Sequence, residues 1–142
     1  MKVHDIMTTP ALTVGPDMPV LEARQLMETR RIRHLPVTDG GRLMGIITDR
    51  DIRLNLPSPA TSLSVWEVNF LIAKLTVGSV MRHTVITVDP QREAADAARI
   101  MLDHKIGALP VVDGGEIVGI VTETDMLRAF ATIAMGTTLV AR

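Results

Sequence analysis

The chain has 142 residues, of which 46% are hydrophobic and 2% aromatic, so one aliphatic core or two very small ones can be built. Its formal net charge is −1 at pH 7, which gives no support to a general binder of nucleic acids or of anionic membranes. Cysteine is absent, which excludes disulfides, thiolate catalysis and cysteine metal ligands.

The N-terminal residues 1–10 lack the apolar core of a signal peptide. No uninterrupted apolar run in the chain reaches the roughly 20 residues that cross a bilayer as a helix. The absence of cysteine fits a reducing compartment. We therefore expect a soluble, cytoplasmic protein with neither a membrane nor a nucleic acid as its partner.

Residues 1–56 predict, in chain order, a strand, a helix, two strands joined by a hairpin turn, and a second helix. Asp17 is expected to cap the first helix. The turn at 39–41 reads DGG, which is typical of a hairpin. The second helix is expected to start at Thr48. The predicted strands cover residues 11–14, 35–37 and 43–47.

Residues 57–76 have no counterpart later in the chain and join its two halves. Ser64 and Glu67 fit a capping box, which predicts a helix from residue 65 to about residue 75. Its apolar residues cover more than one face, so we expect burial on both sides. Either a partner subunit or a gap within the monomer could provide that burial, and the residues alone favour neither.

Residues 77–130 repeat the β-α-β-β-α order of the first copy, and a tail of residues 131–142 follows. The segment LPVTDGGRLMGIITDRD at 35–51 returns as LPVVDGGEIVGIVTETD at 109–125, a constant shift of 74 residues. Each copy alone is near the lower size limit for a stable core, so the copies are expected to hide their apolar faces against each other. The predicted second-copy elements are strands at 85–88, 109–112 and 117–121, and helices from about 91 to 104 and from Thr122.

Each copy ends its last strand with a threonine at a helix start and places an aspartate three residues later: Thr48 with Asp51, and Thr122 with Asp125. One interpretation is a capping box that only satisfies the helix start. The other is a nucleotide site, with phosphate at the free N–H groups and the threonine hydroxyl, and ribose hydroxyls on the carboxylate. Aspartate is shorter than the usual glutamate, so we expect it to reach the N-cap amide less well, which leaves room for binding.

The duplicated unit, the LPVxD strand and the G-φ-φ-T-x-x-D ending (φ apolar) together resemble a pair of CBS domains, the regulatory modules named after cystathionine β-synthase. The resemblance covers residues 3–56 and 77–130, and the chain looks like small stand-alone bacterial proteins of the acetoin-utilisation type. It implies a mixed α/β fold in which two repeats pack sheet to sheet as a pseudo-two-fold Bateman module with two clefts. It also implies a non-catalytic sensor of AMP, ADP or ATP, with magnesium arriving only with the nucleotide, or of S-adenosylmethionine.

The resemblance also implies roles for individual residues. Thr48 and Thr122 match the residues that contact phosphate, and Asp51 and Asp125 match those that contact ribose. Apolar residues around the first strand and the LP strand would hold the base. These are Ala11, Leu12 and Pro36 in the first copy, and Val85, Ile86, Ala108 and Pro110 in the second.

The copies differ just before LPV, where the first has Arg33 and His34 and the second has Gly107 and Ala108. Basic residues at this place grip phosphates in the γ subunit of the AMP-activated kinase, which resembles this module. We therefore expect unequal clefts, with a polyphosphate favouring the one that receives Arg33 and His34. The alternatives are a solvated surface charge for Arg33 and a half-buried strand end for His34.

Other chemistry has weak support. The four histidines lack metal-ligand spacing, and neither G-x-S-x-G nor a P-loop is present. Carboxylate pairs stand at helix starts, where caps explain them more simply than acid–base catalysis. We therefore expect no enzyme. A module for interaction and assembly without nucleotide stays open as an alternative. The resemblance further implies a homodimer and a regulated partner protein, which the residues do not identify.

Overall fold

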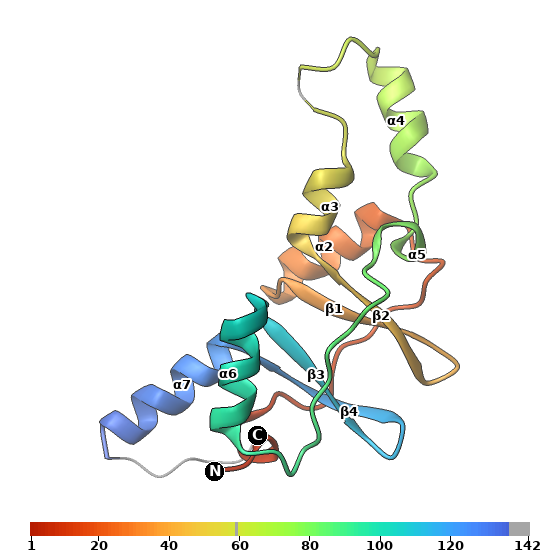
Figure 1. Cartoon of the computed structure of the whole chain (residues 1–142). Helices are drawn as coiled ribbons and strands as arrows, with labels where there is room; N and C mark the ends of the chain where they lie inside the picture. The colour runs from red at the N-terminus through yellow and green to blue at the C-terminus, as the bar shows by residue number, and fades with distance from the viewer. Residues whose placement is uncertain (59, 137–142) are drawn as a thin grey trace. The chain divides into compact units, whose positions relative to one another are not determined.

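The computed structural model describes residues 1–58 and 60–136, which form two compact units (Figure 1). Unit 1 comprises Met1–Ala11 and Val85–Arg142, and unit 2 comprises Leu12–Thr84. Each unit has one two-stranded antiparallel sheet and one cluster of buried apolar side chains. The predicted mixed α/β class is confirmed. Residue 59 of the predicted linker and residues 137–142 of the predicted tail lie outside the described residues.

Unit 2 contains a β-hairpin and the helices that follow and precede it in the chain. Helices α2 and α3 contact each other, and both α3 and α5 contact strand β2. The elements are α2 Val20–Arg30, β1 His34–Asp39, β2 Arg42–Thr48, α3 Asp49–Asn55, α4 Val65–Ala73 and α5 Val77–Val80. The hairpin and its closing helix therefore occur where the sequence predicts them.

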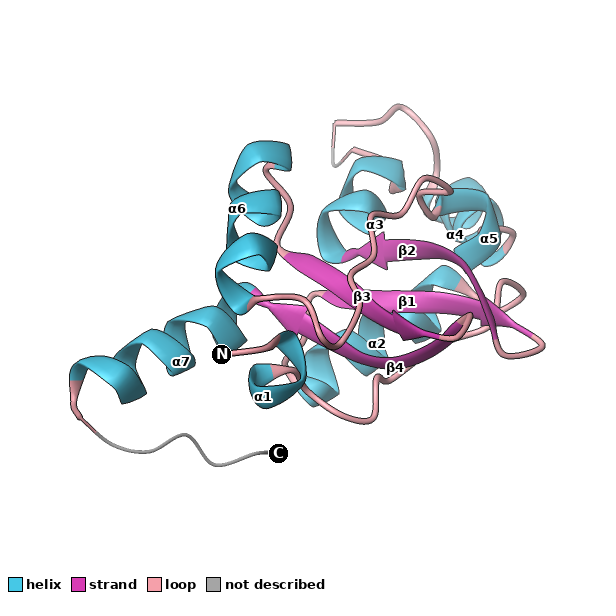
Figure 2. Ribbon diagram, turned by 60° about the horizontal axis from the view of Figure 1, so that its bottom comes forward, coloured by secondary structure: helices cyan, strands magenta, loops and turns pink. Residues whose placement is uncertain are grey.

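Unit 1 repeats this arrangement with the second copy. Helix α6 contacts β3, and α7 contacts β4 and α1. Figure 2 shows both hairpins as strand pairs with helices beside them. The elements are α1 Val3–Ile6, α6 Ala94–His104, β3 Ala108–Asp113, β4 Glu116–Thr122 and α7 Glu123–Ala134.

The predicted first strand of each copy is reduced to a single bridge. Val14 pairs in parallel with Val37, and Val88 pairs in parallel with Val111, without forming a longer ladder. The Val14 N–H donates to the Pro36 carbonyl oxygen at 3.1 Å. Proline on both sides of the 11–14 segment supplies no N–H to extend the pairing. The predicted cap of α2 is wrong as well, because its N-cap is Pro19 and not Asp17.

The first segment of each sequence repeat packs in the unit built around the other repeat. Residues 1–11 belong to unit 1, and residues 77–84 belong to unit 2. We call these two stretches the exchanged segments. Val3 and Ile6 are buried in the apolar cluster of unit 1, with the second copy. Their equivalents Val77 and Val80 are buried in unit 2, with the first copy. Because the repeat keeps the same apolar spacing at both places, either segment has the side chains that either unit needs.

An exposed ion pair also attaches the N-terminal segment to unit 1. The Lys2 ammonium donates to Glu93 Oε1 at 2.5 Å, at the start of α6. This contact holds the pKa of the Glu93 carboxyl below its usual range and raises the pKa of Lys2. The segment is therefore fixed both by buried apolar side chains and by a surface contact.

Helix α4 starts at the predicted capping box, in which Ser64 and Glu67 satisfy each other's backbone amides. Of the two alternatives for covering this helix, burial within the monomer is wrong, since none of its residues is buried within the chain. Across residues 1–58 and 60–136, no helix is long and apolar enough to span a membrane.

Candidate ligand-binding site

The Thr48–Asp51 couple forms a complete capping box at the start of α3. The Asp51 N–H donates to Thr48 Oγ1 at 3.1 Å, and the Thr48 N–H donates to Asp51 Oδ2 at 3.0 Å. Both hydrogen bonds of a capping box are therefore present. Our expectation that aspartate reaches the N-cap amide poorly is wrong, because the helix start brings the shorter side chain close enough.

The second oxygen of Asp51 faces a cation. Arg82 donates from Nε to Asp51 Oδ1 at 3.0 Å. The Asp51 side chain is 8% exposed, whereas the Arg82 side chain is 59% exposed. A nearly buried carboxylate therefore has its charge balanced by a guanidinium that remains open to solvent.

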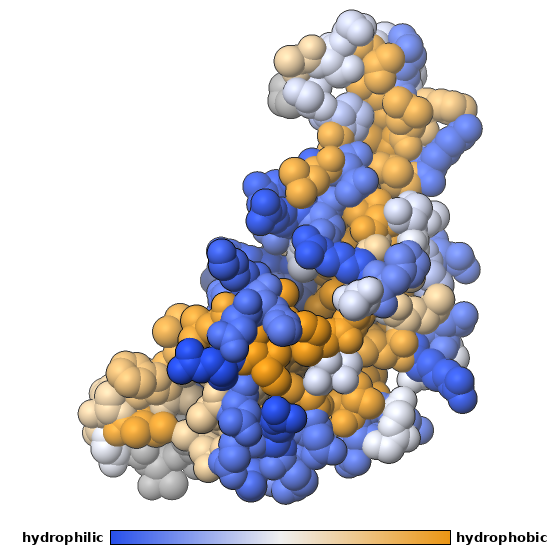
Figure 3. All heavy atoms as spheres, in the orientation of Figure 1, coloured by the Kyte–Doolittle hydropathy of each residue, from blue (hydrophilic) through white to orange (hydrophobic). Residues whose placement is uncertain are grey.

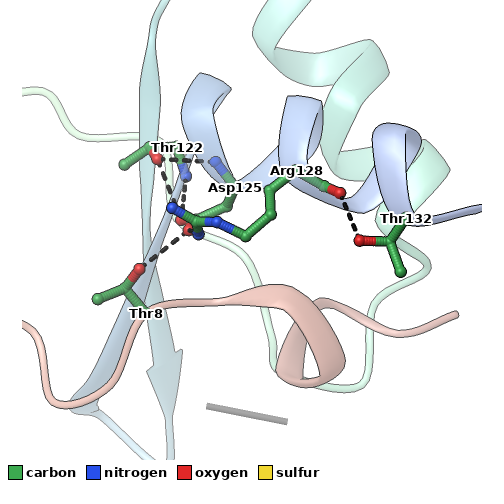
Figure 4. A network of polar contacts seen from close by, with 5 residues as sticks. All are labelled: Thr8, Thr122, Asp125, Arg128 and Thr132. Atoms are coloured by element: carbon green, nitrogen blue, oxygen red, sulfur yellow. Dashed lines mark hydrogen bonds and ion pairs between the residues drawn. The ribbon is translucent and has the colours of Figure 1, made fainter. Parts of the chain in front are cut away.

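The Thr122–Asp125 couple is arranged in the same way at the start of α7 (Figure 4). Asp125 Oδ2 accepts from the Thr122 N–H at 2.9 Å and from the Thr122 hydroxyl at 3.0 Å. Asp125 Oδ1 accepts from the Thr8 hydroxyl at 2.9 Å and from Arg128 Nη1 at 3.1 Å. The Arg128 carbonyl in turn accepts from Thr132, one turn further along α7.

The repeat places Thr8 and Arg82 at equivalent positions, 74 residues apart. In both units the aspartate therefore holds the segment exchanged from the other repeat. The two sites still differ, because a charged group performs this task for Asp51 and a neutral hydroxyl performs it for Asp125. Arg128 supplies the missing positive charge from α7, at a position where the first copy has Leu54.

The pair before LPV lies beside the first couple. His34 is paired with Thr48 across the β1–β2 hairpin. The Arg33 carbonyl accepts from the Asp49 N–H at 3.1 Å, and the Arg33 side chain is exposed. The structure thus brings His34 and the backbone of Arg33 to the start of α3.

The second copy has the same backbone arrangement without the basic side chains. Ala108 is paired with Thr122, and the Gly107 carbonyl accepts from the Glu123 N–H at 3.0 Å. The expected inequality of the two sites is thus present in the distribution of cations, while its effect on a ligand stays a prediction.

The residues expected to hold a base differ in burial. Pro36 and Pro110 have fully buried side chains, and Ala108 is 5% exposed. These three side chains are almost inaccessible. A ligand could contact only their backbone, unless the site rearranges. The other four, which are half-buried, are Ala11, Leu12, Val85 and Ile86.

Sequence reasoning missed Thr8 and Arg128 as partners of Asp125, and Arg82 as the partner of Asp51. The signal for Thr8 was the shift of 74 residues, which aligns it with Arg82. Only the exchange of segments in the folded chain brings Thr8 to Asp125 and Arg82 to Asp51. Within the described ranges, no group of three or more histidine and acidic side chains is placed to hold a metal ion.

The CBS domain family matches residues 3–58 and 77–132 of the chain. The chain belongs to the CBS-domain family. The CBS domain-containing protein YhcV of Bacillus subtilis is 33% identical over 124 residues, which are 87% of this chain and 81% of that protein. Some relatives are longer, since the chain spans 33% of the Methanocaldococcus jannaschii protein MJ1404.

Solved CBS structures have the same fold. A putative acetoin utilization protein (AcuB) from Vibrio cholerae superposes with a TM-score of 0.80 at 32% identity, covering 95% of this chain and 93% of that one. CBSX2 was solved in complex with AMP and superposes with a TM-score of 0.76 at 31% identity, covering 94% and 98%. The CBS pair of MJ0100 was solved with 5′-methylthioadenosine and S-adenosyl-L-methionine, with a TM-score of 0.77, 31% identity and the same coverage.

Proposed function

We propose that this chain is a non-catalytic regulatory module that binds an adenosine-containing ligand beside the threonine–aspartate couple of each unit. The observation that carries the proposal is the recurrence of this couple in both units, each time at a helix start and beside an arginine. Hydroxyl, carboxylate and guanidinium are the groups that suit a nucleoside with an anionic substituent. The AMP complex of CBSX2 and the adenosyl complex of MJ0100 support this ligand class.

The proposed binding mode uses groups that already contact one another. A pair of ribose hydroxyls would donate to Asp51 Oδ1 in place of Arg82, and to Asp125 Oδ1 in place of Thr8 and Arg128. Each arginine would then be released toward the phosphate of the ligand. Because most of the Arg82 side chain is solvent-exposed, its movement requires no repacking of the core.

AMP, ADP and ATP are our first choice of ligand. His34 pairs with Thr48 across the hairpin and Arg33 precedes it with an exposed side chain, and these two basic residues favour additional phosphates in unit 2. Magnesium would enter with such a nucleotide. S-adenosylmethionine and 5′-methylthioadenosine are the alternative, and they suit unit 1 better, where Gly107 and Ala108 carry no charge.

A second candidate function is an interaction module that works without nucleotide. It is favoured by the fact that both oxygens of Asp51 and of Asp125 already have partners within the chain. A ligand would have to compete with these contacts. In this case the couples serve only to fix helix starts and the exchanged segments.

Thermal unfolding and calorimetry of the full chain with AMP, ADP, ATP, S-adenosylmethionine and 5′-methylthioadenosine separate the two functions. Binding should stabilise the protein by about 2.7 kcal/mol at a hundredfold excess over the dissociation constant.

The R33A/H34A double variant should lose more affinity for ATP than for adenosine, because it loses cations and no ribose contact. Absence of binding by all five compounds would favour the interaction module. Equal losses for ATP and adenosine would refute the role of the basic pair.

We also propose that the chain self-associates and acts on a partner protein whose nature stays open. A sensor of this kind works only if the ligand binds one arrangement of the protein better than another. Self-association provides a second surface whose affinity a ligand can change.

A further inference from the structure

Helix α4 and the residue before its cap expose an apolar stripe, the α4 stripe, formed by Leu63, Trp66, Phe70 and Leu71. Trp66 is 83% exposed and Phe70 is 60% exposed, although both are large and apolar. The four residues line one open hollow of about 450 Å³ together with Glu67, so they share one face. Figure 3 shows hydrophobic side chains along the segment that Figure 1 labels α4.

The α4 stripe is uncovered because the helix packs against unit 2 through its opposite side. Val68 and Ile72, four residues apart, are half-buried, and α4 contacts α2. The helix is thus attached to unit 2 by one side. Exposed apolar groups gathered in this way typically mark an interaction site.

The charges of the segment indicate the occupant. Glu67 and Lys74 are the charged residues between positions 63 and 75, and they lie near opposite ends of α4. Lys74 lies over the Phe70 ring, with Nζ 4.1 Å from its centroid, so its charge borders the stripe. Positions 67, 70, 71 and 74 are three or four apart, which places them along one side of a helix.

We propose that the α4 stripe is the surface through which two copies of this chain associate, with their α4 helices antiparallel about a two-fold axis near Phe70 and Leu71. In that pairing Glu67 of each copy meets the partner's Lys74, so a single contact is made twice, as an isologous interface requires. Helix dipoles also oppose each other in this orientation. The surface is therefore complementary to itself in charge.

The expected affinity follows from the size of the stripe. Two copies of the four apolar side chains would bury on the order of 1,000 Å², in the range of weak and transient interfaces. Trp66 and Phe70 should dominate the affinity, since large central aromatic side chains act as hot spots. A reversible dimer is therefore expected.

Sedimentation velocity of the full chain over a range of concentrations tests the proposal. W66S and F70S should each raise the dimer dissociation constant about thirtyfold or more. Both side chains are exposed, so circular dichroism should show an unchanged fold. F130S tests the rival apolar face of α7, where Leu127, Phe130 and Ile133 are exposed, and should leave the dimer intact if the α4 stripe is the interface.

Charge exchange tests the antiparallel geometry. E67K and K74E should each weaken the dimer about fivefold, because each creates two like-charge contacts. A mixture of the two variants should form a heterodimer, and the E67K/K74E double variant should dimerise again. E67Q keeps the capping hydrogen bond to Ser64 without the charge, and separates loss of the pair from fraying of the helix.

Cross-linking locates the axis directly. The chain has no cysteine, so L71C should oxidise to a disulfide-linked dimer while L127C, exposed on α7, should not. A monomeric wild type at all concentrations would refute both self-association and this surface. A dimer that F130S breaks and W66S leaves intact would refute this surface alone. Ligand binding is measured separately and depends on neither outcome, so its failure is distinguishable.

Discussion

At the scale of single residues, Asp51 and Asp125 are the buried charged residues of the part of the chain that the structure describes. Both are nearly buried, and each accepts from its own threonine and from a residue of the exchanged segment. Among the residues that the structure describes, no fully buried side-chain nitrogen or oxygen lacks a partner. Removing one donor therefore leaves a carboxylate whose desolvation is no longer compensated.

Asp51 should depend more on Arg82 than Asp125 depends on Thr8. We expect R82A to lower the free energy of unfolding by about 1–2 kcal/mol, because Asp51 Oδ1 loses its donor. T8A should cost less than about 1 kcal/mol, because Arg128 still donates to the same oxygen of Asp125. Urea unfolding followed by circular dichroism measures both, with R82K as the variant that keeps the charge. Equal costs would contradict the unequal support of the two carboxylates.

At the scale of elements, the glycine of the G-φ-φ-T-x-x-D motif has a structural task. Each exchanged segment pairs with a strand through two backbone hydrogen bonds, Ile46 with Arg82 and Ile120 with Thr8. A Cβ at Gly45 would lie 2.5 Å from the Arg82 carbonyl oxygen, and a Cβ at Gly119 would lie 2.9 Å from that of Thr8. The absence of a side chain at Gly45 and Gly119 therefore leaves room for the backbone of the exchanged segment.

Alanine at either glycine should push the exchanged segment away from its strand. We expect G45A and G119A each to lower the free energy of unfolding by about 1–3 kcal/mol through overpacking. G15A is the matched control, because nothing lies within 4 Å of its added Cβ. Differential scanning calorimetry compares the three proteins. A melting temperature of G45A as high as that of G15A would show that the strand and segment separate at no cost.

At the scale of the whole molecule, the exchange makes each unit dependent on a segment of the other sequence repeat. Val3 and its equivalent Val77 are both fully buried, each in the unit built around the other repeat's hairpin. Contacts between residues far apart in sequence must wait for a long loop to close during folding. Neither sequence repeat is therefore expected to form its native core alone.

The variants V3A and V77A should show this dependence as a crossed pattern. Each deletes two methyl groups from a core and should cost about 1–3 kcal/mol. Hydrogen exchange should accelerate in β3 and β4 for V3A, and in β1 and β2 for V77A. Contiguous repeats would give the reverse assignment, with V3A acting on β1 and β2, and that result would contradict the exchange.

The sequence by itself determined the local structure and the family. The constant shift of 74 residues revealed the duplication, and the DGG turns, the threonine caps and the LPV strands located the hairpins and helices, because turns, caps and side-chain alternation act over a few residues. The identity of the motif residues at matching positions was sufficient to indicate CBS domains. It also brought out the Thr–Asp couples as the candidate site.

Only the tertiary structure decided which segment completes which unit and what each aspartate contacts. Val3 and Val77 stand in equivalent patterns, so local spacing is the same whether the repeats keep or exchange their first segments. The choice rests on packing between residues that are not neighbours in sequence: Val3 lies with side chains of the second copy, and Arg82 meets Asp51, which precedes it by 31 positions. The exposure of the α4 stripe is likewise a property of the folded chain, since a helix with several apolar faces can be covered or left open only once its neighbours are in place.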